Sequence, residues 1–319
     1  FYLIFVSLLV LLSPFYRTSA YWGMEIQYGI ISALLAIYFF TKEDNIKKIS
    51  SGNLFLSIFF SSCTVYFDLK LILIPLYIYI KIIFSNLTFK EKVNNSVIYF
   101  ILAIPFILLI FQWGSLVPIK TQNANPLQGT YLITKVHFVN ILFATNIIGL
   151  YMFPLLIFKR NIFESLKNII NPTNIILFGL FLIYLISFLY FDLFDYTDKF
   201  SREDGGYKNF WGLGYSQKLG NLIFENRFYS LFLNLIIYFV SIIIILLVVG
   251  SRLINLTIVL FFYLQSIFLF PLMQEYFDPY ILIFGILLFK NDYQFNFEKC
   301  TFAFLFFGFF LLSSIYYYQ

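Results

Sequence analysis

The chain has 319 residues, of which 61% are hydrophobic and only 12% are charged, with a formal net charge of +5. Soluble domains carry about 25% charged residues, so this composition excludes a soluble globular protein. The apolar runs are long and continuous rather than alternating, which excludes a β-barrel and predicts an all-α, polytopic transmembrane helix bundle. The small positive charge gives no indication of nucleic-acid binding.

The first apolar run, residues 1–13, has no starting Met, no basic leader and no small-residue cleavage site, so we do not interpret it as a signal peptide. We expect the chain to be part of a longer protein, lacking its first span and first outer loop. Residues 1–319 are predicted to form a single transmembrane domain. Cys63 and Cys300 are far apart in apolar surroundings, which suggests neither a disulfide nor a metal site.

Apolar runs that are long enough to cross or nearly cross a bilayer are found at residues 1–13, 21–40, 97–113, 136–158, 173–190, 228–249, 253–272 and 300–317. Shorter runs at 54–65, 71–84 and 280–289 are marginal as spans, so we expect short tilted helices or re-entrant pairs there. The whole pattern predicts about 9–11 membrane segments, some of them short or re-entrant.

The polar segment Ser13–Tyr28 separates the first two apolar runs and contains Arg17, Tyr21, Trp22 and Glu25. Tyr and Trp favour the membrane interface because their rings have an apolar body and a polar edge. Glu25 falls just inside the next apolar run, where a charge costs up to about 3 kcal/mol at the bilayer centre. Its carboxylate is therefore expected either to face a polar cavity or to snorkel to the interface.

The distribution of Lys and Arg predicts an orientation. If Ser13–Tyr28 is outside, the inner connecting segments carry twelve Lys and Arg residues and the short outer segments carry four. The positive-inside rule favours this arrangement, which requires residues 54–65 and 71–84 to form a hairpin around Tyr66–Lys70. The acidic, glycine-rich segment 191–227 is then an extracytoplasmic loop.

Most of the chemically reactive side chains lie on the outer face in this orientation. Carboxylates, basic residues and aromatic rings at a membrane surface suit glycosyl transfer from a lipid-linked sugar. A carboxylate can act as base toward an acceptor hydroxyl, and an Arg or Lys can stabilise the departing phosphate. The same groups would suit the gate of a transporter. The sequence contains no zinc or nucleotide-binding motif.

Each candidate residue also has a purely structural interpretation. Asp68 and Lys70 could form a helix-connecting turn, because residues two apart do not share a helix face. His137, the only histidine, could be an interfacial residue with no catalytic role. Glu275 and Asp278 share one face if their segment is helical, and otherwise form a turn before the next apolar run.

Four motifs follow one another along the chain: FYRTSAYWGME in the first polar segment, YFDLK at Tyr66–Lys70, the Val136–Phe138 entry to a span, and QEYFDPY at Gln274–Tyr280. Their order resembles the membrane-embedded glycosyltransferases of the GT-C superfamily. It is most similar to the dolichyl-phosphate-glucose-dependent α-1,2-glucosyltransferase family and its bacterial relatives. YFDLK departs from that family's Arg-Gln-Thr-type sequence, and the superfamily's main acidic motif would precede Phe1.

The resemblance implies an inverting-type hexosyltransferase with a GT-C-like fold. It would move a hexose from a polyprenyl-phosphate sugar to a lipid-linked or cell-surface glycan at the extracytoplasmic face. The residues expected to act in catalysis are Glu25, Asp68 and His137. The residues expected to bind substrate are Arg17, Tyr21, Trp22, Lys70, Glu275, Tyr276 and Asp278.

The expected partners are the lipid bilayer, the polyprenyl-phosphate sugar and a glycan acceptor. The expected location is a bacterial inner membrane or the endoplasmic reticulum membrane. No resident cofactor or metal-ligand set is predicted, and a need for a divalent cation is left open. The alternative function is a non-enzymatic carrier, either a flippase for a lipid-linked glycan or a small-solute transporter. Such a carrier needs polar residues along a path through the whole bilayer.

Overall fold

The structure is a computed structural model, and it describes residues 26–42, 49–113, 138–159, 214–224, 226–249, 253–267 and 296–302, with a few other positions between 46 and 308. Within these ranges the chain forms helices and no strand, which confirms the predicted all-α class there. Three of the helices are long and apolar enough to cross a membrane: Phe89–Trp113, Asn140–Phe158 and Tyr229–Val249. Four more are apolar but shorter, so the described part of the chain fits a helical, membrane-associated protein.

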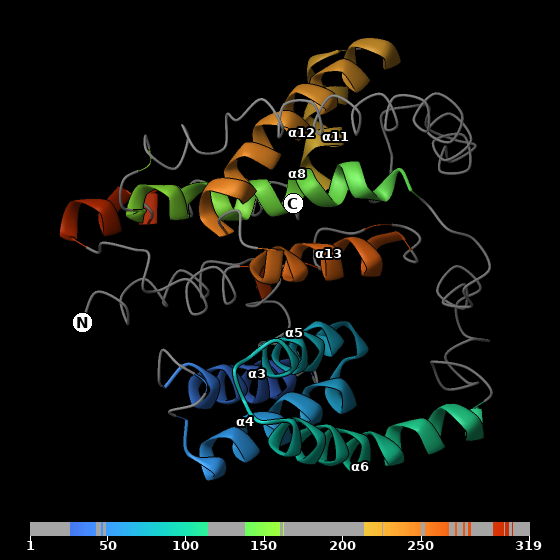
Figure 1. The fold of residues 1–319 in the computed structure, drawn as a ribbon. Helices are drawn as coiled ribbons and strands as arrows, with labels where there is room; N and C mark the ends of the chain where they lie inside the picture. The colour runs from blue at the N-terminus through green and yellow to red at the C-terminus, as the bar shows by residue number, and fades with distance from the viewer. Residues whose placement is uncertain are drawn as a thin grey trace. The chain divides into compact units, whose positions relative to one another are not determined.

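The chain divides into two compact units, and each is treated by itself (Figure 1). What we call the N-terminal unit contains α3 (Ile26–Phe40), α4 (Ser51–Phe67), η3 (Leu69–Ile72), α5 (Leu73–Ile83) and α6 (Phe89–Trp113). What we call the C-terminal unit contains α8 (Asn140–Met152), η5 (Phe153–Phe158), α11 (Gly214–Ile223), α12 (Arg227–Val249) and α13 (Leu253–Ile267).

Helix α4 is central to the N-terminal unit, because it contacts α3, η3, α5 and α6. Its closest neighbour is α3, which buries Gly29, Ala33 and Ala36 along one face. Small residues at this spacing let two membrane helices approach closely and gain van der Waals contact. Ser57 of α4 uses the short distance to donate a hydrogen bond from Oγ to the Ala36 carbonyl at 2.9 Å.

The predicted pair of short helices around Tyr66–Lys70 is present as α4 and α5, which are in contact and joined by η3. Helix α4 begins at a capped end, where the Ser50 Oγ accepts a hydrogen bond from the Asn53 N–H at 3.2 Å. It ends at Phe67 because Asp68 turns to an extended backbone conformation. The two helices are therefore separate elements, as the expected hairpin requires.

Helix α6 begins at Phe89, eight residues before the apolar run that predicted it. Thr88 and Glu91 form a reciprocal cap at this end. The Glu91 Oε2 accepts from the Thr88 N–H at 2.8 Å, and the Thr88 Oγ1 accepts from the Glu91 N–H at 3.4 Å. This capping box satisfies N–H groups that the first turn leaves without partners, so the polar residues after Thr88 become helical.

Helix α8 is central to the C-terminal unit and contacts α11, α12, α13 and η5. It is buried over nearly its whole circumference, from Asn140 to Met152. At Pro154 the chain changes to the 3-10 helix η5, because proline has no N–H to continue the α-helical hydrogen bonds. The two segments together form the second of the three membrane-length helices.

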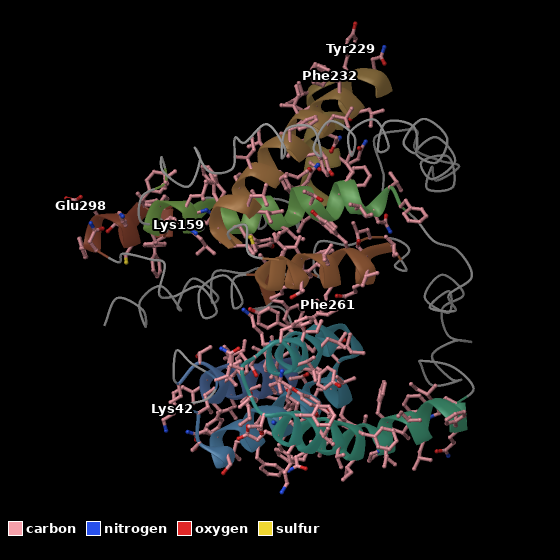
Figure 2. All side chains as sticks on the ribbon, viewed as in Figure 1. Lys42, Lys159, Tyr229, Phe232, Phe261 and Glu298 are labelled. Atoms are coloured by element: carbon pink, nitrogen blue, oxygen red, sulfur yellow. The ribbon has the colours of Figure 1, made fainter. Side chains whose placement is uncertain are left out.

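Helix α12 has a polar inner face and an apolar outer face. The buried polar residues Ser230, Asn234 and Ser241 recur at helical spacing on one side. The opposite side exposes large apolar residues, including Tyr229 and Phe232, which extend outward from α12 in Figure 2. This arrangement reverses the pattern of a helix in water, and it suits a helix surrounded by lipid.

Lys159, at the end of η5, contacts the end of α12. Its Nζ donates a hydrogen bond to the Val248 carbonyl at 3.1 Å (Figure 2 labels Lys159). The last carbonyls of a helix lack partners within the helix, and a positive charge there is favourable. The contact joins the end of η5 to the end of α12, and the Lys and Arg count assigns both of these helix ends to the inner side of the membrane.

Candidate functional site

Of the ten predicted site residues, the structure describes only Asp68 and Lys70. Asp68 ends α4, where its N–H donates to the Thr64 carbonyl at 3.1 Å and its carbonyl accepts from the Leu71 N–H at 3.0 Å. Lys70 follows in η3. The remaining predicted residues lie outside the described part of the chain; they are Arg17, Tyr21, Trp22, Glu25, His137, Glu275, Tyr276 and Asp278.

Asp68 and Lys70 therefore belong to the turn that joins α4 to α5, which was the structural alternative left open for them. The turn is held by backbone hydrogen bonds, and Thr64 reinforces it by donating from Oγ1 to the Leu71 carbonyl at 3.4 Å. The Asp68 side chain is half-buried in this turn. Its catalytic role stays a prediction.

A cavity of about 360 Å³ lies between α4, α5 and α6, which are neighbours in the N-terminal unit (Figure 1). This volume is at the lower end of the range for small-molecule sites. Its walls are mainly apolar and aromatic, and they include Tyr66, Leu76, Tyr79, Tyr99, Phe100 and Phe106. No charged residue is among the lining residues.

The hydroxyl groups in this lining are largely used within the protein. Tyr66 donates to the Leu102 carbonyl at 2.5 Å, and the Tyr99 hydroxyl lies 3.1 Å from the Ser61 Oγ. The Tyr79 hydroxyl lies 3.2 Å from the Ser96 Oγ, which in turn donates to the carbonyl of Lys92 at 2.9 Å. The cavity consequently presents carbon surface rather than free hydrogen-bonding groups.

The C-terminal unit contains a second notable feature, a buried cluster of amides and hydroxyls that we call the amide cluster. Its members are Asn146 of α8, Ser216 and Gln217 of α11, and Ser230 and Asn234 of α12. The Asn146 Nδ2 donates to the Ser216 Oγ at 2.9 Å, and the Asn234 Nδ2 donates to the Gln217 Oε1 at 3.0 Å. Hydrogen bonds between helices of this kind contribute about 1 kcal/mol each in a membrane.

The amide cluster is uncharged and closely packed. Gly220 of α11 makes this possible, because an added Cβ would overlap the Ser230 Oγ and lie 3.3 Å from the Asn234 Nδ2. The Asn146 Oδ1 is buried and has no hydrogen-bond partner among the groups that the structure describes. Burial also raises the pKa of the neighbouring Tyr215 hydroxyl, so this group stays neutral.

Sequence reasoning missed this cluster, because it weighed charged residues and treated 191–227 as a loop. Helix α11 lies inside that predicted loop, over Gly214–Ile223. Its sequence is too short and too polar to register as an apolar run, and its polar face is buried against α8 and α12. The available signal was the four-residue spacing of Ser230 and Asn234 within a long apolar run, which marks one polar face of a membrane helix.

Among the residues that the structure describes, no group of three or more His, Cys, Asp or Glu side chains could hold a metal ion. Comparisons with protein-family models, curated proteins and solved structures find no match to this chain. The function is therefore inferred from the motifs of the sequence and from the positions of charged and polar groups within each unit.

Proposed function

We propose that the protein is a multi-pass integral-membrane glycosyltransferase with a GT-C-like bundle of about 9–11 membrane segments. It transfers a hexose from a polyprenyl-phosphate sugar to a lipid-linked or cell-surface glycan at the extracytoplasmic face of a bacterial inner membrane or the endoplasmic reticulum membrane. Support comes from the order of the four sequence motifs and from the membrane-length apolar helices of both units.

The observation that carries the proposal is where charges occur in the described apolar helices. Helices α3, α4, α8 and α13 contain no Asp, Glu, Lys or Arg. In α5, α6 and α12 the charged residues are confined to the first or last turn; they are Lys81, Lys90, Glu91, Lys92 and Arg227. A carrier of ions or charged solutes needs charged groups along the transport path, and the interiors of these described helices offer none, which favours an enzyme over such a carrier.

In the proposed reaction a bond forms between the anomeric carbon of the hexose and an acceptor oxygen, while the bond from that carbon to the phosphate oxygen breaks. A carboxylate takes the acceptor proton, and polyprenyl phosphate leaves. Glu25, Asp68 and His137 are the proposed acid-base residues. Arg17 and Lys70 stabilise the phosphate, and sugar contacts come from Tyr21, Trp22, Glu275, Tyr276 and Asp278.

The proposal is tested by incubating the purified full-length protein with a radiolabelled polyprenyl-phosphate hexose and candidate lipid-linked acceptors. We expect label to move to the acceptor with release of polyprenyl phosphate. The same protein in sealed vesicles provides the contrasting test. Movement of the intact lipid-linked sugar across the bilayer, with no bond broken, would contradict the enzyme and support a flippase.

Glu25 provides the sharpest single-residue test of the proposed site. Glu25→Gln removes the charge while keeping the shape, so loss of a general base is expected to lower the transfer rate by about 100-fold or more. Glu298→Gln, at an exposed position, is the matched control and should leave the rate unchanged. Abundance and thermal stability should stay near wild type for both variants. Full activity of Glu25→Gln would remove this residue from the site.

A further inference from the structure

The cavity between α4, α5 and α6 has no role in the proposed reaction, and its lining indicates what it binds. Its side-chain hydroxyls belong to Ser62, Tyr66, Tyr79, Ser96 and Tyr99, and all except that of Ser62 have a hydrogen-bonding neighbour inside the protein. A sugar or phosphate placed there would lose its water without gaining partners, at a cost of several kcal/mol. The lining therefore favours a hydrocarbon ligand.

The cavity can be reached from the hydrocarbon layer of the membrane. Tyr66, Leu76 and Phe100 belong to its lining and are also exposed on the surface of the N-terminal unit. On α6 the side that faces away from the cavity is exposed as well, with large apolar residues such as Ile101 and Leu108. A helix of this length and composition meets lipid along its surface, so lipid chains are the molecules adjacent to the cavity opening.

The dimensions of the cavity match one acyl chain. On α6 the lining extends from Ser96 to Phe106, which is about 15 Å along the helix axis. This is half of the roughly 30 Å hydrocarbon thickness of a bilayer, and so the depth of one leaflet.

One end of the cavity lies beside a basic segment. Lys92 is one turn before Ser96 on the same face of α6, about 6 Å along the axis from the first lining residue. Lys81 of α5 lies on a different face, with its Nζ 5.4 Å from the ring centre of Tyr77, which does not line the cavity, so we take Lys92 as the basic group at this end of the cavity. Positive charge at the end of an apolar cavity between membrane helices is complementary to an anionic lipid headgroup.

We propose that this cavity holds one acyl chain of an anionic membrane phospholipid, with the lipid phosphate at Lys92. The chain gains van der Waals contact with the aromatic walls, which is the attraction available between apolar groups already in lipid. The charge-assisted contact to Lys92 selects anionic over zwitterionic headgroups. This inference is independent of glycosyl transfer, so either proposal can fail without the other.

Native mass spectrometry of the full-length protein with added phosphatidylglycerol tests the proposal. We expect tighter binding than for phosphatidylcholine of the same chain length. Lys92→Gln should weaken phosphatidylglycerol binding by about fivefold, while Lys90→Gln on the same turn should leave it unchanged. Ala103→Phe fills the cavity and should weaken binding tenfold or more, while Ile104→Phe on the exposed side of α6 should not.

The acyl-chain position can also be measured without any substitution, which covers the case in which Ala103→Phe does not fold. A phosphatidylglycerol carrying a photoreactive group in mid-chain should label peptides from residues 62–66, 72–79 and 96–106 of the wild-type protein. Labelling elsewhere, or equal binding by Ala103→Phe, would overturn the proposal. Stronger competition by polyprenyl phosphate than by phosphatidylglycerol would also overturn it, because the occupant would then be an isoprenoid chain.

Discussion

Gly149 of α8 shows how a single residue controls the distance between two membrane helices. An added Cβ would lie 2.7 Å from the Cα of Ser241 on α12 and closer still to its side chain. Backbone atoms cannot be displaced without moving the helix, so this contact requires glycine. The same contact brings α8 close enough to α12 for Asn146 to reach the backbone of Asn234, whose carbonyl oxygen lies 3.4 Å from Nδ2.

Replacing Gly149 should therefore separate α8 from α12. We expect Gly149→Ala to lower the free energy of unfolding by about 1–3 kcal/mol, because the helices must shift to admit the methyl group. Steric trapping or thermal unfolding in detergent measures the change. Gly52→Ala is the matched control, since an added Cβ there meets no atom within 4 Å. Equal stability of the two variants would contradict the close approach.

At the same scale, the sequence shows which polar and charged residues are unusual beside or within apolar runs, but it does not show which of them contact one another in the fold. Charged residues in apolar runs are costly, so Glu25 and Asp68 were apparent from the sequence. Neutral amides cost less and are harder to recognise. Asn146 and Asn234 are far apart in the chain, and only the packing of α8 against α12 shows that both belong to one buried cluster.

At the scale of elements, hydropathy predicted where apolar helices exist but misplaced their ends. The apolar run 97–113 predicted α6, yet the helix starts earlier because the Thr88–Glu91 cap stabilises a polar first turn. Helix α11 was missed because burial of its polar side against α8 and α12 stabilises it, rather than its own apolar content. Capping and polar packing are interactions that an average over residue hydrophobicity does not contain.

The cap of α6 gives a prediction at this scale. Glu91→Ala leaves the Thr88 N–H without its carboxylate partner, so the first turn of α6 should open more often. We expect faster amide hydrogen exchange over residues 88–92, corresponding to about 1 kcal/mol of lost local stability. The neighbouring variant Lys90→Ala, which leaves the Thr88–Glu91 pair intact, should keep the slow exchange. Unchanged exchange in Glu91→Ala would show that the cap does not hold the turn.

At the scale of the whole molecule, the orientation in the membrane is the main prediction. Segments 41–53 and 159–172 should face the cytoplasm, because their Lys and Arg excess opposes translocation. With Cys63 and Cys300 changed to Ser, Lys42→Cys and Asn168→Cys should resist an impermeant thiol reagent in intact cells. Ser115→Cys and Ser201→Cys should react. The opposite labelling pattern would move the proposed site to the cytoplasmic face.

The switch from α8 to η5 at Pro154 has a consequence for fit to the bilayer. A 3-10 helix rises about 2.0 Å per residue, compared with about 1.5 Å for an α-helix. The segment Asn140–Phe158 therefore extends about 32 Å, whereas the same residues as a continuous α-helix would extend only about 28 Å. The six 3-10 residues of η5 thus lengthen a helix that would otherwise be shorter than the hydrocarbon layer is thick. The segment matches that thickness without an added residue and without thinning of the bilayer.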